Sequence, residues 1–158
     1  MITTASGAKI YIGPTTAVTG ATDAAIITAY KALTFVEVKE VENLGEFGDK
    51  AADVTFTSLS DARVRHLKGA RDAGVLSLVV GRDPFDPGQI AERTKFAYAI
   101  KIVAADAPDE NDTPTTFFFH ALVQSAKENF GAADNVVKTS IDLGITTPIY
   151  EDVAAIVP

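Results

Sequence analysis

Apolar and polar side chains alternate along much of this chain with a period near two, which is typical of β-strands that bury one face. The alternation predicts strands over residues 8–13, 33–42, 53–59, 95–104, 115–130 and 135–145. Residues 75–81 form a nearly continuous apolar run that ends at a glycine, so a strand buried on both faces is predicted there. Strands therefore dominate the expected structure.

Helices are predicted at two places. A short helix over residues 24–31 follows Asp23, whose carboxylate suits the capping position. A second helix is predicted from Asp86 to Lys95, because Pro87 fits the first helical position and good helix formers follow it. Residues 60–74 favour neither a helix nor a strand. The acidic, proline-bearing linker at 105–114 predicts a hairpin loop between two strands.

These elements predict a mainly β fold, namely an antiparallel β-sandwich or partly closed barrel with one flanking α-helix. The 158 residues suit one domain that spans 1–158, and no internal repeat divides them. Apolar residues make up 47% of the chain, yet no window approaches the roughly 20 consecutive apolar residues of a membrane-spanning helix. The first residues lack the pattern of a secretory signal, so we expect a soluble, unsecreted protein with no membrane partner.

Composition and charge exclude several classes of function. Without cysteine, the chain has no disulfide framework, no thiolate nucleophile and no cysteine metal site. Acidic residues outnumber basic ones by 21 to 14, a net charge of −7. This balance argues against wrapping nucleic acid, because that binding depends on cations that displace counterions from phosphates. An acidic surface instead suits a protein that avoids adhering to DNA.

Candidate catalytic side chains are few. His66 lies in a basic run without a carboxylate at helical spacing, and His120 lies in an apolar predicted strand. A nucleophilic site needs a base within reach of a serine or cysteine, and the sequence marks no such set. The spacings typical of zinc, calcium, dinucleotide and Walker-type sites are also missing. We therefore expect no catalytic residue, no metal site and no cofactor.

The chain contains one markedly acidic and one markedly basic stretch. Residues 42–56, ENLGEFGDKAADVTF, are interpreted as a long acidic loop with one bare aromatic between two glycines. Residues 60–74 are the most basic part of the chain, with Arg63, Arg65, His66, Lys68 and Arg71. A nucleic-acid patch is one interpretation of the basic stretch, but it lacks aromatic side chains that would stack on bases. Pairing of Arg63, Arg65, Lys68 and Arg71 with acids such as Glu46 and Asp49, in the same subunit or a neighbouring one, is favoured, which predicts an oppositely charged interface.

Residues 35–84 combine a strand, the acidic loop, a Thr-rich strand ending in TSL, a KG-x-x-D-x-G turn at 68–74 and an apolar strand. Residues 117–145 then form a closing hairpin, in which a strand with apolar and small residues is followed by a Gly/Asp/Asn turn and a last alternating strand. In this order and spacing, most of the chain resembles the tail tube (major tail) proteins of long-tailed bacteriophages. Residues 14–32 match nothing in that family.

The resemblance implies a two-sheet barrel or sandwich beside a helix, with six copies per ring and rings stacked into a hollow tube through which DNA leaves the capsid. The implied partners are further copies of the chain and other tail proteins such as the tape measure, the tail terminator and the baseplate. DNA is expected to pass through the lumen without specific binding. The implied location is the virion tail, after assembly in the host cytoplasm.

Two sets of residues gain expected roles from this resemblance. A ring-to-ring joint needs a bendable loop that orders on a partner, and an exposed aromatic offers contact area at low entropy cost. The ring-stacking loop is expected to comprise Gly45, Glu46, Phe47, Gly48, Asp49 and Lys50, with Phe47 as its anchor. The alternative is that Phe47 folds back under its own loop. Acids that face the lumen and repel DNA are expected among Glu37, Glu40, Glu42 and Asp142.

Three alternatives stay open. A tail terminator or a baseplate ring protein would share the same barrel and the same resemblance. A small β-barrel binding module would instead need an interior cavity. The bulky residues expected at the centre argue against such a cavity: Phe96, Tyr98, Phe117, Phe119 and Ile141.

Overall fold

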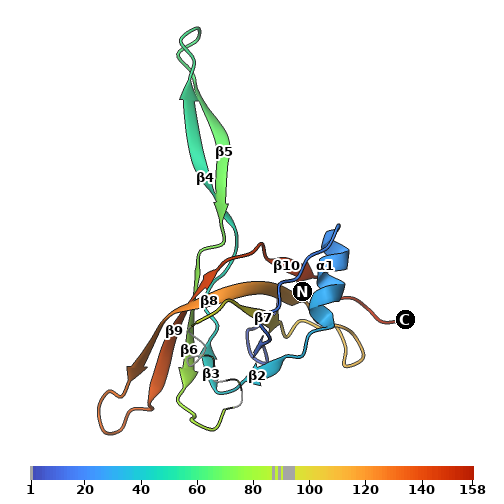
Figure 1. The fold of residues 1–158 in the computed structure, drawn as a ribbon, viewed down its shortest axis with the longest axis vertical. Coiled ribbons are helices and arrows are strands. Elements are labelled where there is room, and N and C mark those ends of the chain that lie inside the picture. Colours follow the sequence, from blue (N-terminus) through green and yellow to red (C-terminus); the bar gives the residue numbers. More distant parts are fainter. Residues whose placement is uncertain (1, 87, 89, 91–94) are drawn as a thin grey trace.

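The chain folds mainly into antiparallel β-strands (Figure 1), as shown by a computed structural model that describes residues 2–86, 88, 90 and 95–158. The elements are β1 (Lys9–Ile12), α1 (Asp23–Lys31), β2 (Val36–Val38), β3 (Val41–Asn43), β4 (Lys50–Thr57), β5 (Val64–Asp72), β6 (Val75–Gly81), β7 (Tyr98–Val103), β8 (Thr116–Asn129), β9 (Lys138–Ile145) and β10 (Tyr150–Asp152). The predicted mainly β class is confirmed, since the described residues form antiparallel sheets with one helix and no closed barrel. The helix predicted over 86–95 falls largely on residues outside the described part of the chain.

Eight strands form one sheet in the order β2-β1-β7-β8-β9-β6-β3, and β10 pairs with the first residues of β8. The long strand β8 joins two halves of this sheet, because its residues 116–121 pair with β7 and its residues 121–129 pair with β9. Only Lys39 and Glu40 separate the two edge strands β2 and β3 in the chain. The sheet therefore curls until its edges come near each other.

The concave side of the curled sheet holds the main core. Ile10, Leu78, Ile100, Phe119 and Ile141 come from five different strands, are at most 1% exposed and belong to one cluster. Burying a side chain of this size contributes about 1.5–3 kcal/mol. The interior is packed with side chains, as predicted from the bulky residues, although Phe96 is 60% exposed and lies outside this core.

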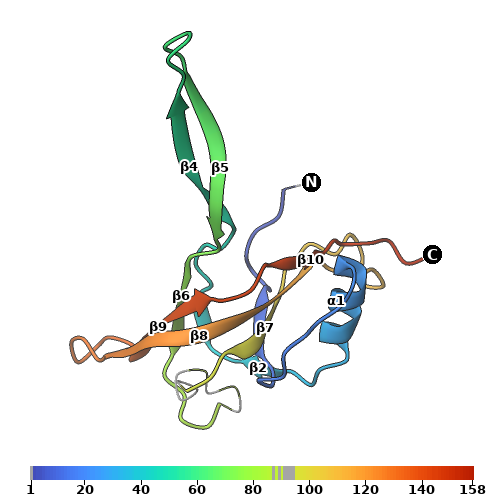
Figure 2. The same cartoon turned by 45° about the horizontal axis from the view of Figure 1, so that its top comes forward.

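Helix α1 covers part of the outer face of the sheet near β10 (Figure 2). Its N-cap is Thr22, whose hydroxyl accepts a hydrogen bond from the backbone N–H of Ala25 at 3.2 Å. The prediction of Asp23 as the cap was wrong by one residue. Asp23 occupies the first turn, where its charge suits the positive end of the helix dipole. With nine residues α1 is too short to cross a membrane, and the described residues contain no longer helix.

A buried hydrogen-bond chain ties α1 to β8 and to the preceding loop. The Tyr30 hydroxyl lies 2.6 Å from Nδ1 of His120, and Nε2 of His120 lies 2.8 Å from the carbonyl oxygen of Thr16. Because a carbonyl oxygen only accepts, Nε2 carries the proton and Nδ1 accepts from the tyrosine. The Tyr30 ring also stacks on Phe118 at 5.4 Å, and burial raises the pKa of Tyr30. Residues 14–32 are thus anchored to the sheet.

Two predicted strands differ from the observed ones. The strand predicted over 33–42 is divided into β2 and β3, because Glu40 adopts the left-handed conformation with φ of 57°. Strand β6 was predicted to be buried on both faces, and this was wrong. Leu76 and Leu78 are buried, whereas Val75 is 49% exposed, because α1 lies over the other half of the sheet.

The strands β4 and β5 form a separate two-stranded sheet that stands away from the rest of the molecule (Figures 1 and 2). The stretch interpreted as a long loop is therefore shorter than expected, since β4 begins at Lys50. Residues 60–74, for which no element was predicted, contain β5. Strand β10 is also additional to the prediction.

Candidate assembly surfaces

We name residues 50–72, which comprise β4, β5 and the turn between them, the arm. Its ladder runs from the pair Lys50 and Asp72 at the base to the pair Thr57 and Val64 near the tip. The arm pairs with no other strand among the described residues. An isolated two-stranded hairpin is only marginally stable in water. The arm is therefore expected to gain stability when another surface covers one of its faces.

The two faces of the arm differ in polarity. Directly opposite residues of an antiparallel pair point to the same side, and Val54 lies opposite Leu67 while Phe56 lies opposite Arg65. Val54, Phe56 and Leu67 therefore share one side, which we name the apolar face of the arm. Their exposures of 47%, 57% and 57% leave large hydrophobic side chains in contact with water. Contiguous apolar surface of this kind marks a contact site.

The apolar face is missing from the residues predicted from the sequence, although a signal for it is present. Ser58, Ser60 and Asp61 form a cluster of turn-forming residues at the end of the alternating stretch over 53–59. The structure uses that cluster as the tip, where Arg63 donates its backbone N–H to the Asp61 carboxylate at 3.1 Å. A hairpin prediction at this point brings the apolar residues of both strands to one side.

The arm is cationic and the rest of the chain is anionic. Residues 50–72 hold five lysines and arginines and three aspartates, a net of +2, which leaves −9 for the remaining residues. Within the predicted charge patch, Arg65 pairs with Asp61 at 2.6 Å. Arg63, Lys68 and Arg71 form no ion pair with any described residue. Their pairing with acids of a neighbouring subunit stays a prediction.

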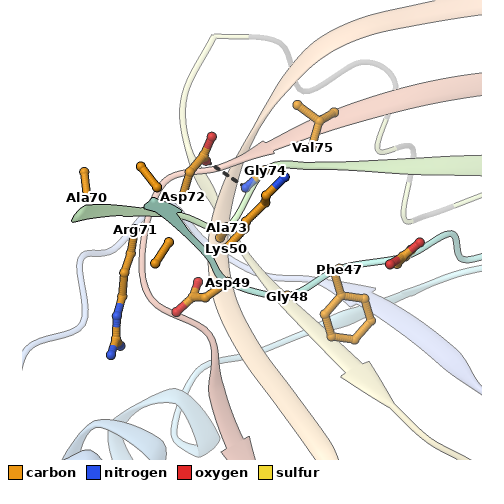
Figure 3. Close-up of a pocket in the computed structure, with 13 residues that line it drawn as sticks. Phe47, Gly48, Asp49, Lys50, Ala70, Arg71, Asp72, Ala73, Gly74 and Val75 are labelled. Carbon is orange, nitrogen blue, oxygen red and sulfur yellow. Dashed lines mark hydrogen bonds between the residues drawn. The ribbon is translucent and has the colours of Figure 1, made fainter. Parts of the chain in front are cut away.

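A groove of about 770 Å³ opens where the arm leaves the sheet (Figure 3). The side chains of Asp49 and Arg71 lie on one side of it, and Phe47 lies at the other end. The Asp72 carboxylate accepts a hydrogen bond from the backbone N–H of Gly74 at 2.8 Å, and Gly74 has a φ of 76°. This Asx-type turn sets the direction in which the arm continues from β6.

Phe47 is not held out as a bare aromatic, so that part of the loop interpretation was wrong. Its ring meets Phe117 edge to face with centroids 5.0 Å apart and lies 6.1 Å from Phe119. Phe47 is partly buried and packs against the main core. Gly45, with a φ of 73°, donates its backbone N–H to the Asn43 side chain at 2.7 Å and approaches β6 closely. The role of residues 45–50 in ring stacking stays a prediction.

A polar area lies on the outside of β6, β9 and the second part of β8, and Asp142 is at its centre. The hydroxyls of Ser77 and Ser125 each donate to the Asp142 carboxylate at 2.9 Å. These two bonds, with a smaller contribution from Lys127, hold the pKa of Asp142 below its usual range. Asp142 therefore stays ionised at neutral pH.

The other acids predicted to face a lumen are spread over β2, β3 and the link between them. Glu37 lies 3.7 Å from the ammonium of Lys9, and Glu42 pairs with Lys138 at 2.6 Å. Glu42 is on the edge strand β3 and Asp142 is on β9, and β6 lies between these two strands. Glu37 is on β2, at the opposite edge of the sheet. Glu40 is exposed in the link. Whether these acids face a lumen stays a prediction.

The described residues show no arrangement that supports catalysis or metal binding. Both ring nitrogens of His120 are used to hold α1 and the loop at Thr16. His66 lies on the exposed arm with Nδ1 2.8 Å from the Asp53 carboxylate. No group of three potential metal-ligating side chains occurs among the described residues.

Comparison with known proteins identifies a shared fold. A scan against protein-family models finds no match, and neither does a search of curated proteins. Among solved structures, the sheath/tube terminator of the PVC extracellular contractile injection system matches with a TM-score of 0.67 and 10% identity, over 96% of this chain and 97% of that one. The SPP1 tail tube matches with a TM-score of 0.57 and 15% identity, over 92% and 76%. The baseplate of the anti-feeding prophage matches with a TM-score of 0.62 and 13% identity, over 97% and 98%.

The chain therefore has the fold found in tail tube, tube terminator and baseplate structures, which agrees with the resemblance seen in the sequence.

Proposed function

We propose that this chain is a structural, non-enzymatic subunit that assembles with copies of itself into hexameric rings, which stack as a phage tail tube and conduct DNA during ejection. The fold supports this class, since the matched structures belong to a tail tube, a sheath/tube terminator and a baseplate. The observation that carries the proposal is the arm. A projecting hairpin that exposes an apolar face, and whose Arg63, Lys68 and Arg71 form no ion pair with any described residue, is suited to contact with a second molecule.

In this proposal the whole chain, residues 1–158, acts as one tail-tube-like domain. The curled sheet forms the wall of a ring, and the arm, with the loop at 45–50 beside its base, reaches the next copy. The polar area around Asp142 then lines the lumen together with Glu37, Glu40 and Glu42, where negative charge repels DNA phosphates and prevents adhesion. The tape measure, the terminator and the baseplate are the other partners, in the virion tail after assembly in the host cytoplasm.

A terminator or baseplate ring protein is the second candidate. It is favoured by the TM-scores of 0.67 and 0.62 to structures of those assemblies, which exceed the 0.57 to a tail tube. The two candidates differ in one property, because tube subunits stack into long polymers, whereas a terminator forms a ring that caps a tube end.

Electron microscopy of the concentrated purified protein, together with light scattering after size exclusion, tests both candidates. We expect rings with six-fold symmetry, and stacked rings if the chain is the tube subunit. Single rings that never lengthen would favour the terminator or baseplate role. A protein that stays monomeric at concentrations of several milligrams per millilitre would refute self-assembly into rings.

A further inference from the structure

We propose that the arm of one copy docks on an acidic surface of a second copy, formed by residues 105–114 and 150–157, which we name the acidic ledge. The inference rests on the proposed function, because it specifies which surfaces join two copies. The arm and the ledge lie on different parts of the subunit (Figures 1 and 2). Within the ledge, Tyr150 packs against the buried cluster around Tyr30.

The acidic ledge is an ordered surface made from two segments that are distant in the sequence. Thr113 pairs with Ala155, and the backbone N–H of Val157 donates to the Asp112 carboxylate at 2.9 Å. Thr115 donates its backbone N–H and its hydroxyl to Asp106 at 2.8 and 2.6 Å. Figure 2 shows the C-terminal segment running past the loop between β7 and β8. These bonds hold both segments in place before a partner arrives.

The ledge combines negative charge with exposed apolar side chains. Its two segments contain six acids and no lysine or arginine: Asp106, Asp109, Glu110, Asp112, Glu151 and Asp152. Asp152 is paired with Lys31 of α1 at 2.6 Å, whereas Glu110 and Glu151 form no ion pair with any described residue. Between these acids, Val153, Ile156 and Val157 are 66%, 75% and 50% exposed.

The arm and the ledge are complementary in charge, and both expose apolar side chains. On the arm, the apolar face of Val54, Phe56 and Leu67 also carries Arg65, which lies opposite Phe56. Arg63 near the tip and Lys68 on the other face of the arm form no ion pair with any described residue. Docking the apolar face on the apolar side chains of the ledge removes both from water, and it brings the cations to the acids. Docking of arm on arm or of ledge on ledge would instead place like charges together.

The proposed contact joins two different surfaces of the subunit, and this determines how copies assemble. Because the arm and the ledge are different surfaces of one subunit, each docked copy still offers a free arm and a free ledge. Such a heterologous contact propagates from copy to copy and closes into a ring or continues as a stack. The same contact made twice between two copies would need a two-fold arrangement, and the proposed function predicts rings and stacks.

The turn between β8 and β9 provides an internal comparison. It also exposes apolar side chains, Phe130 and Val136, at 60% and 69%. Its flanking charges are balanced, with Lys127 and Lys138 near Glu128 and Asp134. It therefore offers hydrophobic surface of similar exposure without the charge that complements the arm, and it serves as the control site.

Cross-linking tests the contact directly, because the chain has no cysteine. A tagged Leu67→Cys variant and an untagged Ile156→Cys variant are mixed under assembly conditions and treated with a short bismaleimide. We expect a heterodimer band from this pair. The matched pair of Leu67→Cys with Val136→Cys is expected to stay at the background of the cysteine-free chain. Equal cross-linking of the two pairs, or cross-linking to Val136 alone, would overturn the inference.

Charge reversal provides the second measurement. Arg63→Glu with Lys68→Glu is expected to weaken self-association about tenfold or more, as is Glu110→Arg with Glu151→Arg. All four changes in one chain are expected to restore association. Lys39→Glu with Lys95→Glu makes the same change in net charge at exposed cations off the arm, and this control is expected to associate like the wild type.

The outcomes separate this inference from the proposed function. An arm-reversed variant that forms particles as readily as the wild type overturns the arm-to-ledge contact and leaves the ring proposal standing. Failure of the four-fold variant to recover association likewise overturns the specific pairing. A wild-type chain that never associates overturns both.

Discussion

Replacing Phe47 with alanine distinguishes a core role for this side chain from a role as an exposed anchor. Truncating a fully buried phenylalanine costs about 3–5 kcal/mol, and edge-to-face aromatic pairs contribute about 0.5–1.5 kcal/mol of such values. Phe47 is partly buried, with its ring 5.0 Å from that of Phe117. We therefore expect Phe47→Ala to lower the free energy of unfolding by about 2 kcal/mol, roughly half of the fully buried value.

The assay is urea denaturation followed by far-ultraviolet circular dichroism, at a protein concentration low enough to keep copies apart. The matched control is Phe56→Ala on the apolar face of the arm, where the ring is 57% exposed. Surface substitutions of this kind usually change stability by less than about 0.5 kcal/mol. Phe56→Ala is expected to leave unfolding unchanged and to reduce association at high concentration.

The opposite pattern would refute this reasoning. If Phe47→Ala unfolds at the wild-type urea concentration and abolishes ring stacking, Phe47 contributes nothing to the fold and the exposed-anchor interpretation is restored. If Phe56→Ala destabilises the monomer as strongly as Phe47→Ala, the arm is already covered within its own subunit. Either result would move the contact surface away from the apolar face of the arm.

Three further predictions concern single hydrogen bonds and one glycine. Gly45→Ala is expected to lower the free energy of unfolding by more than about 1 kcal/mol in urea melts, because its φ is 73° and an added Cβ would meet the carbonyl oxygen of Ser77. Ser77→Ala is expected to raise the pKa of Asp142 toward its ordinary value, as followed by carboxyl-carbon NMR. Because the pKa of Asp142 is lowered in the folded state, its ionised carboxylate stabilises the fold fully at pH values above the ordinary pKa of an aspartate. This contribution is lost as the pH falls through the folded-state pKa, so the free energies of unfolding of wild type and variant are expected to converge in strong acid. Tyr30→Phe leaves Nδ1 of His120 as a buried acceptor without a donor, and a loss of about 1–3 kcal/mol is expected in thermal melts.

Sequence patterns predicted those strands and the helix that are determined by residues close together in the chain. The strands β1, β7, β8 and β9 each alternate over most of their length, and each was predicted within a few residues of its observed bounds. The helix α1 was predicted as well, because its start and its composition are encoded within a few neighbouring residues. Local rules suffice where one face of an element meets the core and the other meets water.

The elements that differed depend on contacts between distant residues. The apolar run of β6 is typical of a strand buried on both faces, yet its burial depends on where α1 lies, and that is set by Tyr30, Phe118 and His120. The position of Phe47 depends on Phe117, which is 70 positions later in the chain. Neither of these long-range contacts produces a periodic pattern in the sequence around β6 or around Phe47.

The arm shows a different kind of discrepancy, because its pattern and its burial disagree. Val54, Phe56 and Leu67 alternate and align across the ladder as core residues do, but about half of each side chain is exposed. Prediction from hydrophobic periodicity assumes that an apolar face packs against the core of its own chain, and here no described residue of the subunit covers that face.

Natural monomers rarely keep an exposed apolar strip on a lone hairpin, since it adds a hazard of non-specific pairing without adding stability. The discrepancy is explained most simply if the covering surface is on another molecule, and the net charge of +2 on the arm favours an acidic surface. A chain whose remaining residues carry −9 provides that surface itself, so a second copy meets both requirements without a further protein.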